Sequence, residues 1–252
     1  MAIDLPILLR AYAAGLFPMA DDRRAGSVFW VEPESRAILP LDGFHLSRSL
    51  RKTVRADRFE VTADTAFEQV IALCAQSADD RPTTWINHEI EEAFVRLHRQ
   101  GLAHSVECWL GQGAERRLVG GLYGLALGRA FFGESMFSRA TDASKVAMAW
   151  LVARLRVGGF SLLDCQFMTP HLASLGAVEI SAEVYSGLLG EALGDGAGAG
   201  GGAGAGAGLF SSLEALAGRA EPVPDSRSRP ATWTVSGPAS GQLIVQLITQ
   251  TS

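Results

Sequence analysis

Two carboxylates stand where apolar stretches of the sequence end. Glu134 follows the apolar, glycine-rich stretch that begins at Gly120, and Asp164 closes the run 160–163, with Gln166 two residues later. A buried carboxylate costs free energy unless it is paired or has a function. At strand ends, where ligands gather, two carboxylates could position a nucleophile and assist its deprotonation. Structural capping remains an equally good explanation of both residues at this point.

Other motifs in the region predict neither a cofactor nor a metal. The glycines of 120–128 lack the Gly-Lys-Ser/Thr ending of a phosphate loop and lead into more strand. The five histidines and three cysteines show no metal-ligand spacing, and Cys165 with His171 is too thin a basis for a nucleophilic dyad. Ser144 and Lys145, at a helix start after Asp142, would suit an anion, but a surface lysine explains them more simply.

Composition limits the possible partners and location. The 252 residues, 48% of them hydrophobic, can bury a full core. A net charge of −5 excludes global attraction to a polyanion, so any nucleic acid must meet a local patch. Three scattered cysteines predict no disulfide framework and favour a reducing cytoplasm. No apolar run approaches the ~20 residues of a membrane span, so we expect no membrane partner. The short apolar run 5–9 is preceded by Asp4 and interrupted by Arg10, which disfavours a signal peptide.

One local patch stands out in this acidic chain. The segment 45–55 predicts a short helix with four basic side chains, namely Arg48, Arg51, Lys52 and Arg55. A solvated helix face is the simpler interpretation of such a run. Contact with nucleic-acid phosphates is the alternative, and the isolation of the run keeps it open.

The elements around these residues follow from periodicity and turn signals. Helices are expected over 4–15, 45–55, 64–74, 87–101, 143–157 and 182–193, with a short helical turn at 171–172. Strands are expected over 29–31 and 37–39 as a hairpin around Pro33, and over 59–62, 103–110, 160–163 and 177–180. The central stretch from 118 to Glu134 suits a buried strand pair. Residues 16–19 look like an exposed apolar corner, and 242–249 like a segment that adds to a sheet edge or stays mobile.

These elements predict an α+β chain with four parts. We expect a small N-terminal region over 1–57 and the main domain over 58–193. A linker made almost purely of Gly and Ala follows over 194–208, and a C-terminal tail over 209–252. The antiparallel pair around the 111–116 turn is the best sign of a central sheet.

From about residue 8 to 185 the sequence resembles the leucyl/phenylalanyl-tRNA–protein transferases, with the shared motifs in the family's order. The motifs are Phe17-Pro18, Phe44-His45, Ser47-Arg48-Ser49-Leu50, Thr84-Trp85-Ile86, Leu97-His98, Gly101, Ala103-His104-Ser105-Val106-Glu107, Trp109, Val119-Gly120-Gly121, Tyr123-Gly124, Phe132-Gly133-Glu134-Ser135-Met136-Phe137-Ser138, Ala143-Ser144-Lys145, Asp164-Cys165-Gln166 and Ser174-Leu175-Gly176-Ala177. The Gly/Ala linker and the tail lie outside the resemblance.

The resemblance implies a fold and an activity. The fold would be a mixed sheet flanked by helices, like that of acyl-CoA N-acetyltransferases, after a small N-terminal region. The activity would be transfer of Leu or Phe, less often Met, from aminoacyl-tRNA to the α-amine of proteins that begin with Arg or Lys. The product would be an N-degron, a signal for protein degradation.

The resemblance also implies roles for single residues. Asp164 and Gln166 would act on the attacking amine, and Glu134 would help to bind the acceptor or the aminoacyl end. Trp85 would contact the 3′ adenosine of the tRNA; Met19 and Phe94 stand nearby, where some members carry Trp and Tyr. The amino-acid side chain would lie in an apolar pocket of Leu122, Phe131, Met148, Leu151 and Leu163.

The implied reaction suits the residues. Aminolysis of an ester needs a neutral amine, an oriented carbonyl and a stabilised oxyanion, without metal or ATP. Our hypothesis is that Asp164, with Gln166, orients the amine and assists its deprotonation, with the adenosine 2′-hydroxyl able to share that task. The basic run would meet tRNA phosphates, while acidic residues would receive the Arg or Lys N-terminus.

Three other functions can be weighed against this one. An acyl-CoA N-acyltransferase should carry a pyrophosphate loop of the form Q/R-x-x-G-x-G/A, and residues 138–145 lack its glycines. An arginyl-type or leucyl transferase acting on acidic N-termini is closer, but an arginyl pocket would be polar at Leu122, Phe131 and Leu163. A non-catalytic RNA-binding module would have no use for the two carboxylates.

Overall fold

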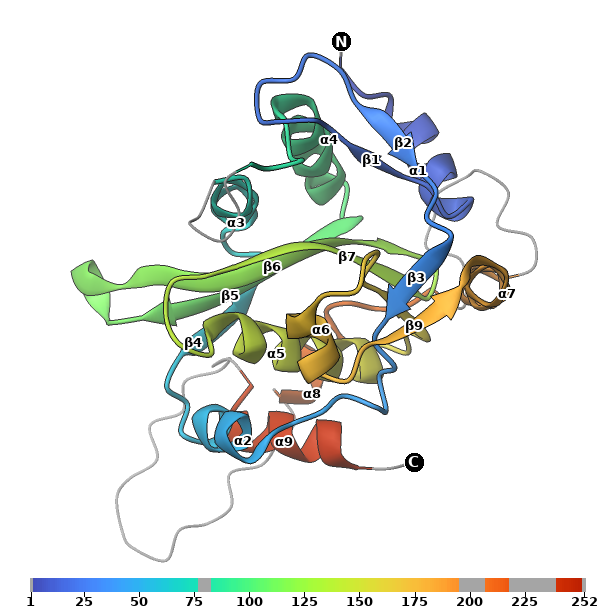
Figure 1. The fold of residues 1–252 in the computed structure, drawn as a ribbon. Coiled ribbons are helices and arrows are strands. Elements are labelled where there is room, and N and C mark those ends of the chain that lie inside the picture. Colours follow the sequence, from blue (N-terminus) through green and yellow to red (C-terminus); the bar gives the residue numbers. More distant parts are fainter. Residues whose placement is uncertain (1, 77–82, 195–206, 218–238, 251–252) are drawn as a thin grey trace, which may run out of the picture.

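A seven-stranded mixed sheet forms the centre of the protein (Figure 1). The computed structural model describes residues 2–76, 83–194, 207–217 and 239–250. Most of the predicted Gly/Ala linker, and much of the predicted tail, therefore lie outside the described residues. The expected α+β class, with a mixed sheet flanked by helices, is confirmed. The strand order is β4 (Glu60–Ala63), β5 (Ala103–Leu110), β6 (Arg117–Leu127), β7 (Ala130–Ser138), β8 (Leu162–Asp164), β3 (Ser35–Ile38) and β9 (Val178–Ser181).

Helices cover both faces of this sheet (Figure 1). One face carries α3 (Phe67–Cys74) and α4 (His88–Arg99), with α1 (Leu5–Ala13) near one end. The other face carries α5 (Ala143–Val157), and α6 (Pro170–Ser174) lies beside it. Beyond α5 lie α2 (Arg48–Arg55), α8 (Ser212–Ala217) and α9 (Gly241–Thr249), while α7 (Ala182–Leu193) borders the β9 edge. None of the described helices is both long and apolar enough to cross a membrane.

The strands β5, β6 and β7 form an antiparallel meander, in which the β5–β6 pair agrees with the prediction from the alternation over 103–110 and the turn at 111–116. The tight turn between β6 and β7 is closed by Leu127 and Ala130, with Gly128 at φ +58°. In the middle of this hairpin the register shifts, because Tyr123 faces Ser135 whereas the adjacent Gly124 faces Gly133. Glu134 is thus the extra residue of a β-bulge, an irregularity that changes the direction of a side chain.

The strand β8 pairs in parallel with β7 over three residues and then stops. The last pair joins Phe132 to Asp164, and Asp164 also faces Ile38 of β3. The prediction that both carboxylates end strands is therefore half right. Asp164 ends β8, whereas Glu134 lies inside β7, which continues because it still pairs with β6.

Three expectations about local structure are wrong. Residues 29–31 and 37–39 do not form a hairpin: β2 (Phe29–Val31) pairs with β1 (Phe17–Met19), and β3 joins the main sheet. The supposed exposed corner at 16–19 contains β1, and Phe17 is buried. Residues 242–249 form helix α9, which buries Ile244, Val245 and Ile248. Their i, i+1, i+4 spacing gives a helix one apolar face, and this face packs on α2 and α5.

The helix α5 has a second apolar layer behind it. Twelve of its residues are buried, so it has no solvated face like that of an ordinary surface helix. The helices α2, α8 and α9 cover its outer side, and Arg154 of α5 donates to the carbonyl oxygen of Phe210 at 3.0 Å. The strand β3 similarly inserts part of the predicted region 1–57 into the main sheet. The boundary at residue 57 stays a prediction.

Candidate active site

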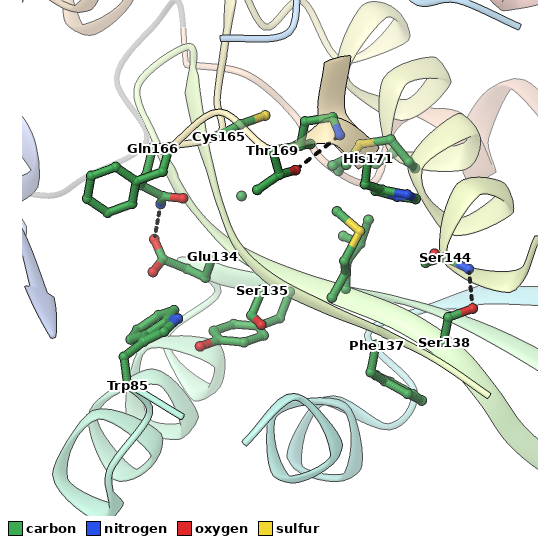
Figure 2. Close-up of a pocket in the computed structure, with 18 of the residues that line it drawn as sticks. Trp85, Glu134, Ser135, Phe137, Ser138, Ser144, Cys165, Gln166, Thr169 and His171 are labelled. Atoms are coloured by element: carbon green, nitrogen blue, oxygen red, sulfur yellow. Dashed lines mark hydrogen bonds between the residues drawn. The ribbon is translucent and has the colours of Figure 1, made fainter. Parts of the chain in front are cut away.

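A cavity of about 630 Å³ opens between β7, the start of α5 and the segment that follows β8 (Figure 2). It lies where β7 and β8 part, so the backbone there leaves room for a ligand. Most residues expected to act on the substrates line it. They are Met19, Trp85, Leu122, Glu134, Met148, Leu151, Leu163 and Gln166.

Glu134 is the carboxylate that lines this cavity among the described residues. Its Oε1 accepts a hydrogen bond from the Tyr12 hydroxyl at 2.8 Å and another from Gln166 Nε2 at 3.2 Å (Figure 2 shows the second). Its Oε2 is buried and has no partner among the described residues. Burial raises the pKa of Glu134 to about 8, although the Tyr12 hydrogen bond opposes this. The group can therefore exchange a proton near neutral pH.

Asp164 has a different environment, because its own partners fully enclose it. Arg36 Nε donates to its Oδ1 at 3.0 Å, and Arg36 Nη2 donates to its Oδ2 at 2.7 Å. Tyr185 donates to Oδ2 at 2.9 Å and the Gln166 backbone N–H to Oδ1 at 2.8 Å. Asp164 is not among the described residues that line the cavity. Its carboxylate therefore holds other groups in place.

Arg36 is a site-supporting residue that the sequence analysis missed. Its guanidinium lies over the rings of Phe17 and Tyr185, at 4.8 and 4.4 Å from their centroids, and Nη1 donates to the Gly15 carbonyl oxygen at 2.7 Å. Burial lowers its pKa, but the bond to Asp164 outweighs this and raises the pKa above its ordinary value. Arg36 therefore stays charged. The one available signal was a single arginine at the start of an apolar strand.

Tyr12 is the second missed residue, because its position fits the apolar stripe of α1. It is fully buried, and its ring packs edge-on against Phe132 with centroids 5.0 Å apart. Burial, with the nearby Glu134 charge, raises the pKa of its hydroxyl well above the ordinary value. Tyr12 therefore stays protonated, and its hydroxyl donates a hydrogen bond to Glu134.

Gln166 links the two carboxylates. Its side chain donates to Glu134 and its backbone N–H to Asp164. Its φ of +56° is a left-handed conformation that non-glycine residues adopt at a cost of about 1–3 kcal/mol. The Asp164 hydrogen bond to the backbone two residues later supports this turn. The turn places the Gln166 amide beside Glu134 (Figure 2).

Two of the expected contact residues do not line the cavity. Phe94 is fully buried and packs edge-on against Tyr123, with ring centroids 5.3 Å apart. Phe131 is also fully buried, stacked with Phe210 at 5.7 Å. Both rings are therefore walls of the core behind the cavity. Trp85 is half-buried at the cavity edge, on the opposite side of Glu134 from Gln166 (Figure 2).

The basic run forms α2, whose Arg48, Lys52 and Arg55 are exposed and whose Arg51 is half-buried. Among the described residues, no carboxylate lies within ion-pair distance of these four side chains. They are available to an external anion. The described part of the chain also contains no group of three or more His, Cys, Asp or Glu residues that could hold a metal ion.

Known proteins resemble the chain over its whole length. Residues 38–190 match the family model for leucyl/phenylalanyl-tRNA protein transferase, and residues 1–34 match that for the N-terminal domain of the same proteins. A leucyl/phenylalanyl-tRNA–protein transferase of Rhizorhabdus wittichii is 62% identical over 255 residues, covering 100% of this chain and 99% of the relative. One of Zymomonas mobilis is 62% identical over 191 residues, covering 76% and 70%.

Among solved structures, FemX aligns with a TM-score of 0.48 and 10% identity, covering 69% of this chain and 66% of FemX. That likeness is too distant to support a conclusion about this site. The full-length relative and the two family models agree with each other and with the motifs in the sequence. The chain therefore belongs to the leucyl/phenylalanyl-tRNA protein transferase family, whose members are aminoacyltransferases that use tRNA.

Proposed function

We propose that the enzyme transfers Leu or Phe, and less often Met, from aminoacyl-tRNA to the α-amine of proteins that begin with Arg or Lys. The product carries an N-degron for protein degradation. The observation that carries this proposal is one cavity in which a buried carboxylate with an unpaired oxygen, Glu134, adjoins an apolar wall. In such a site the apolar side chain of the donor can lie against the wall while the amine of the acceptor binds the carboxylate.

The apolar wall suits the amino-acid side chain of the donor. Leu122, Met148, Leu151 and Leu163 line the cavity and are buried. Such a wall distinguishes side chains by size and would leave an arginyl or acidic side chain without polar partners. This supports Leu, Phe and Met over the arginyl-type alternative. Trp85 and Met19, which also line the cavity, are the proposed contacts of the 3′ adenosine.

We assign the proton transfer to Glu134. The nitrogen of the neutral amine bonds to the ester carbonyl carbon and the bond from that carbon to the ribose oxygen breaks. The proton that the nitrogen loses passes through Glu134 to the leaving ribose oxygen, which departs as a hydroxyl. An N-terminal α-amine has a pKa of about 8, which matches the raised pKa of Glu134 at about 8. A matched pair exchanges the proton with little free-energy cost.

Asp164 then acts through its neighbours, as a positioning residue. It fixes Arg36, Tyr185 and the Gln166 backbone, and Gln166 in turn fixes Glu134. This differs from the hypothesis that Asp164 itself meets the amine, because Asp164 does not line the cavity. The exposed cations of α2 are the proposed contacts of the tRNA phosphates. Three buried free cysteines are compatible with a cytoplasmic location.

One assay tests the proposal against its alternatives. Labelled Leu-tRNA or Phe-tRNA is incubated with the enzyme and a peptide that begins with Arg, beside one that begins with Asp. We expect label only on the Arg peptide. Label on the Asp peptide would favour a transferase for acidic N-termini. Acylation from acetyl-CoA without tRNA would favour an acyl-CoA N-acyltransferase, and tRNA binding without transfer would favour an RNA-binding module.

A further inference from the structure

A large aromatic ring stands exposed at the cavity and has no part in the mechanism above. Phe167 is 46% exposed and lines the cavity directly after Gln166. Among the described phenylalanines, only Phe29 has a comparable exposure, at 45%, and it does not line the cavity. Single exposed apolar residues need no explanation on a surface. An exposed ring beside the groups that would bind the attacking amine is a different case.

The ring of Phe167 is held in place by the same network that holds the carboxylates. It packs edge-on against Phe17, with centroids 5.6 Å apart and planes at 77°. Arg36, which is bound to Asp164, lies over the other ring of this pair, at 4.8 Å from the Phe17 centroid. The left-handed turn at Gln166 fixes the backbone just before Phe167. Phe167 is therefore a pre-organised surface, and binding to it costs little ordering entropy.

The charges of the cavity leave a cationic side chain of the acceptor without a partner. Glu134 is the sole carboxylate among the described lining residues, and the mechanism commits it to the α-amine. An Arg or Lys side chain extends only a few bonds from that amine. An aromatic face attracts such a cation, and none of the cation–ring contacts found among the described residues involves Phe167.

We propose that Phe167 binds the Arg or Lys side chain of the acceptor through a cation–π contact. The inference rests on the proposed function and adds a specificity-determining residue to it. Glu134 would bind the α-amine, and the ring of Phe167 would bind the charged guanidinium or ammonium group of the side chain. The adenosine of the donor would bind across Glu134 at Trp85, since Gln166 and Trp85 lie on opposite sides of that carboxylate (Figure 2).

The test compares Phe167→Leu, Phe167→Trp and the unsubstituted enzyme with peptides that begin with Arg or with citrulline, the neutral isostere of Arg. An exposed cation–π contact is worth about 0.5–1 kcal/mol, so we expect Phe167→Leu to raise KM for the Arg peptide about two- to fivefold. KM for the citrulline peptide and for aminoacyl-tRNA should not change. Phe167→Trp should keep or lower KM for the Arg peptide.

The control is Phe29→Leu, which removes an equally exposed ring outside the cavity and should leave every KM unchanged. Higher KM for aminoacyl-tRNA in Phe167→Leu, with that for the Arg peptide unchanged, would assign the ring to the donor and overturn the proposal. An equal rise in KM for the Arg and citrulline peptides in Phe167→Leu would show that Phe167 does not recognise the charge of the side chain, and would also overturn the proposal. If the unsubstituted enzyme transferred nothing to the Arg peptide, the proposed function would fail, and this assignment with it.

Discussion

Replacing Glu134 with Gln removes one buried ionisable group while keeping an acceptor oxygen for Tyr12 and Gln166. The pKa of this carboxyl rises from its ordinary 4.5 to about 8 in the folded protein, mainly because it is buried. Between these two values the folded state binds more protons than the unfolded state. The free energy of unfolding of the natural protein must therefore fall as the pH rises through this window.

The size of the effect follows from the width of that window. At about 1.4 kcal/mol per pH unit, the interval from 4.5 to about 8 corresponds to at most about 5 kcal/mol. The Gln variant has no such ionisation. Its free energy of unfolding, relative to that of the natural protein, should therefore increase between pH 5 and pH 9 by several kcal/mol, up to this limit.

Urea unfolding of both proteins at pH 5, 7 and 9 measures this difference. The control is Glu179→Gln, which removes an exposed carboxylate on the edge strand β9 instead of a buried one. A difference between natural protein and Glu134→Gln that stays constant with pH would refute the reasoning. The same variant should transfer about 10²- to 10⁴-fold more slowly if Glu134 takes the proton. Near-normal transfer would return that role to another group.

Two further predictions concern the ion pair and the basic helix. Asp164→Asn leaves the Arg36 charge buried without its partner, which should cost about 3–5 kcal/mol of stability. The variant should therefore have a lower melting temperature and a lower single-turnover transfer rate than the natural protein. Near-normal transfer with intact tRNA binding would show that the ion-pair network is dispensable. Reversing Arg48 and Lys52 to Glu should weaken tRNA binding and reduce the slope of log Kd against log salt by about 0.7–0.9 per lost phosphate contact. An unchanged slope would identify α2 as a solvated face.

The parts of the fold that the sequence predicts are those with local signals. The antiparallel pair β5–β6 combines strict alternation over 103–110 with the turn at 111–116, and both signals are local in the sequence. The pairing of β1 with β2 and of β3 with β9 depends on which strand edge is open in the folded chain. That is a property of distant segments, so the hairpin predicted around Pro33 is wrong although its two strands are nearly right.

The same distinction applies to the site. Glu134, Asp164 and Gln166 are conspicuous because polar residues interrupt apolar strands. Arg36 and Tyr12 lie 128 and 122 residues from the carboxylates that they contact. Nothing in the spacing of a sequence reports a buried contact over such a distance. The sequence alone therefore does not show that Glu134 lines the cavity while Asp164 is enclosed, because this difference depends on where Tyr12 and Arg36 lie.

Two backbone irregularities produce the site, one on each side of the gap between β7 and β8. The bulge at Glu134 requires a small residue opposite it, because a Cβ at Gly124 would lie 2.3 Å from the carbonyl oxygen of Phe132. The left-handed turn at Gln166 is held by Asp164. Each irregularity costs free energy locally, and the hydrogen bond from Gln166 to Glu134 joins them. The N-terminal segment supplies two further partners of the carboxylates, Tyr12 and Arg36, so its docking and the geometry of the carboxylates must be established together.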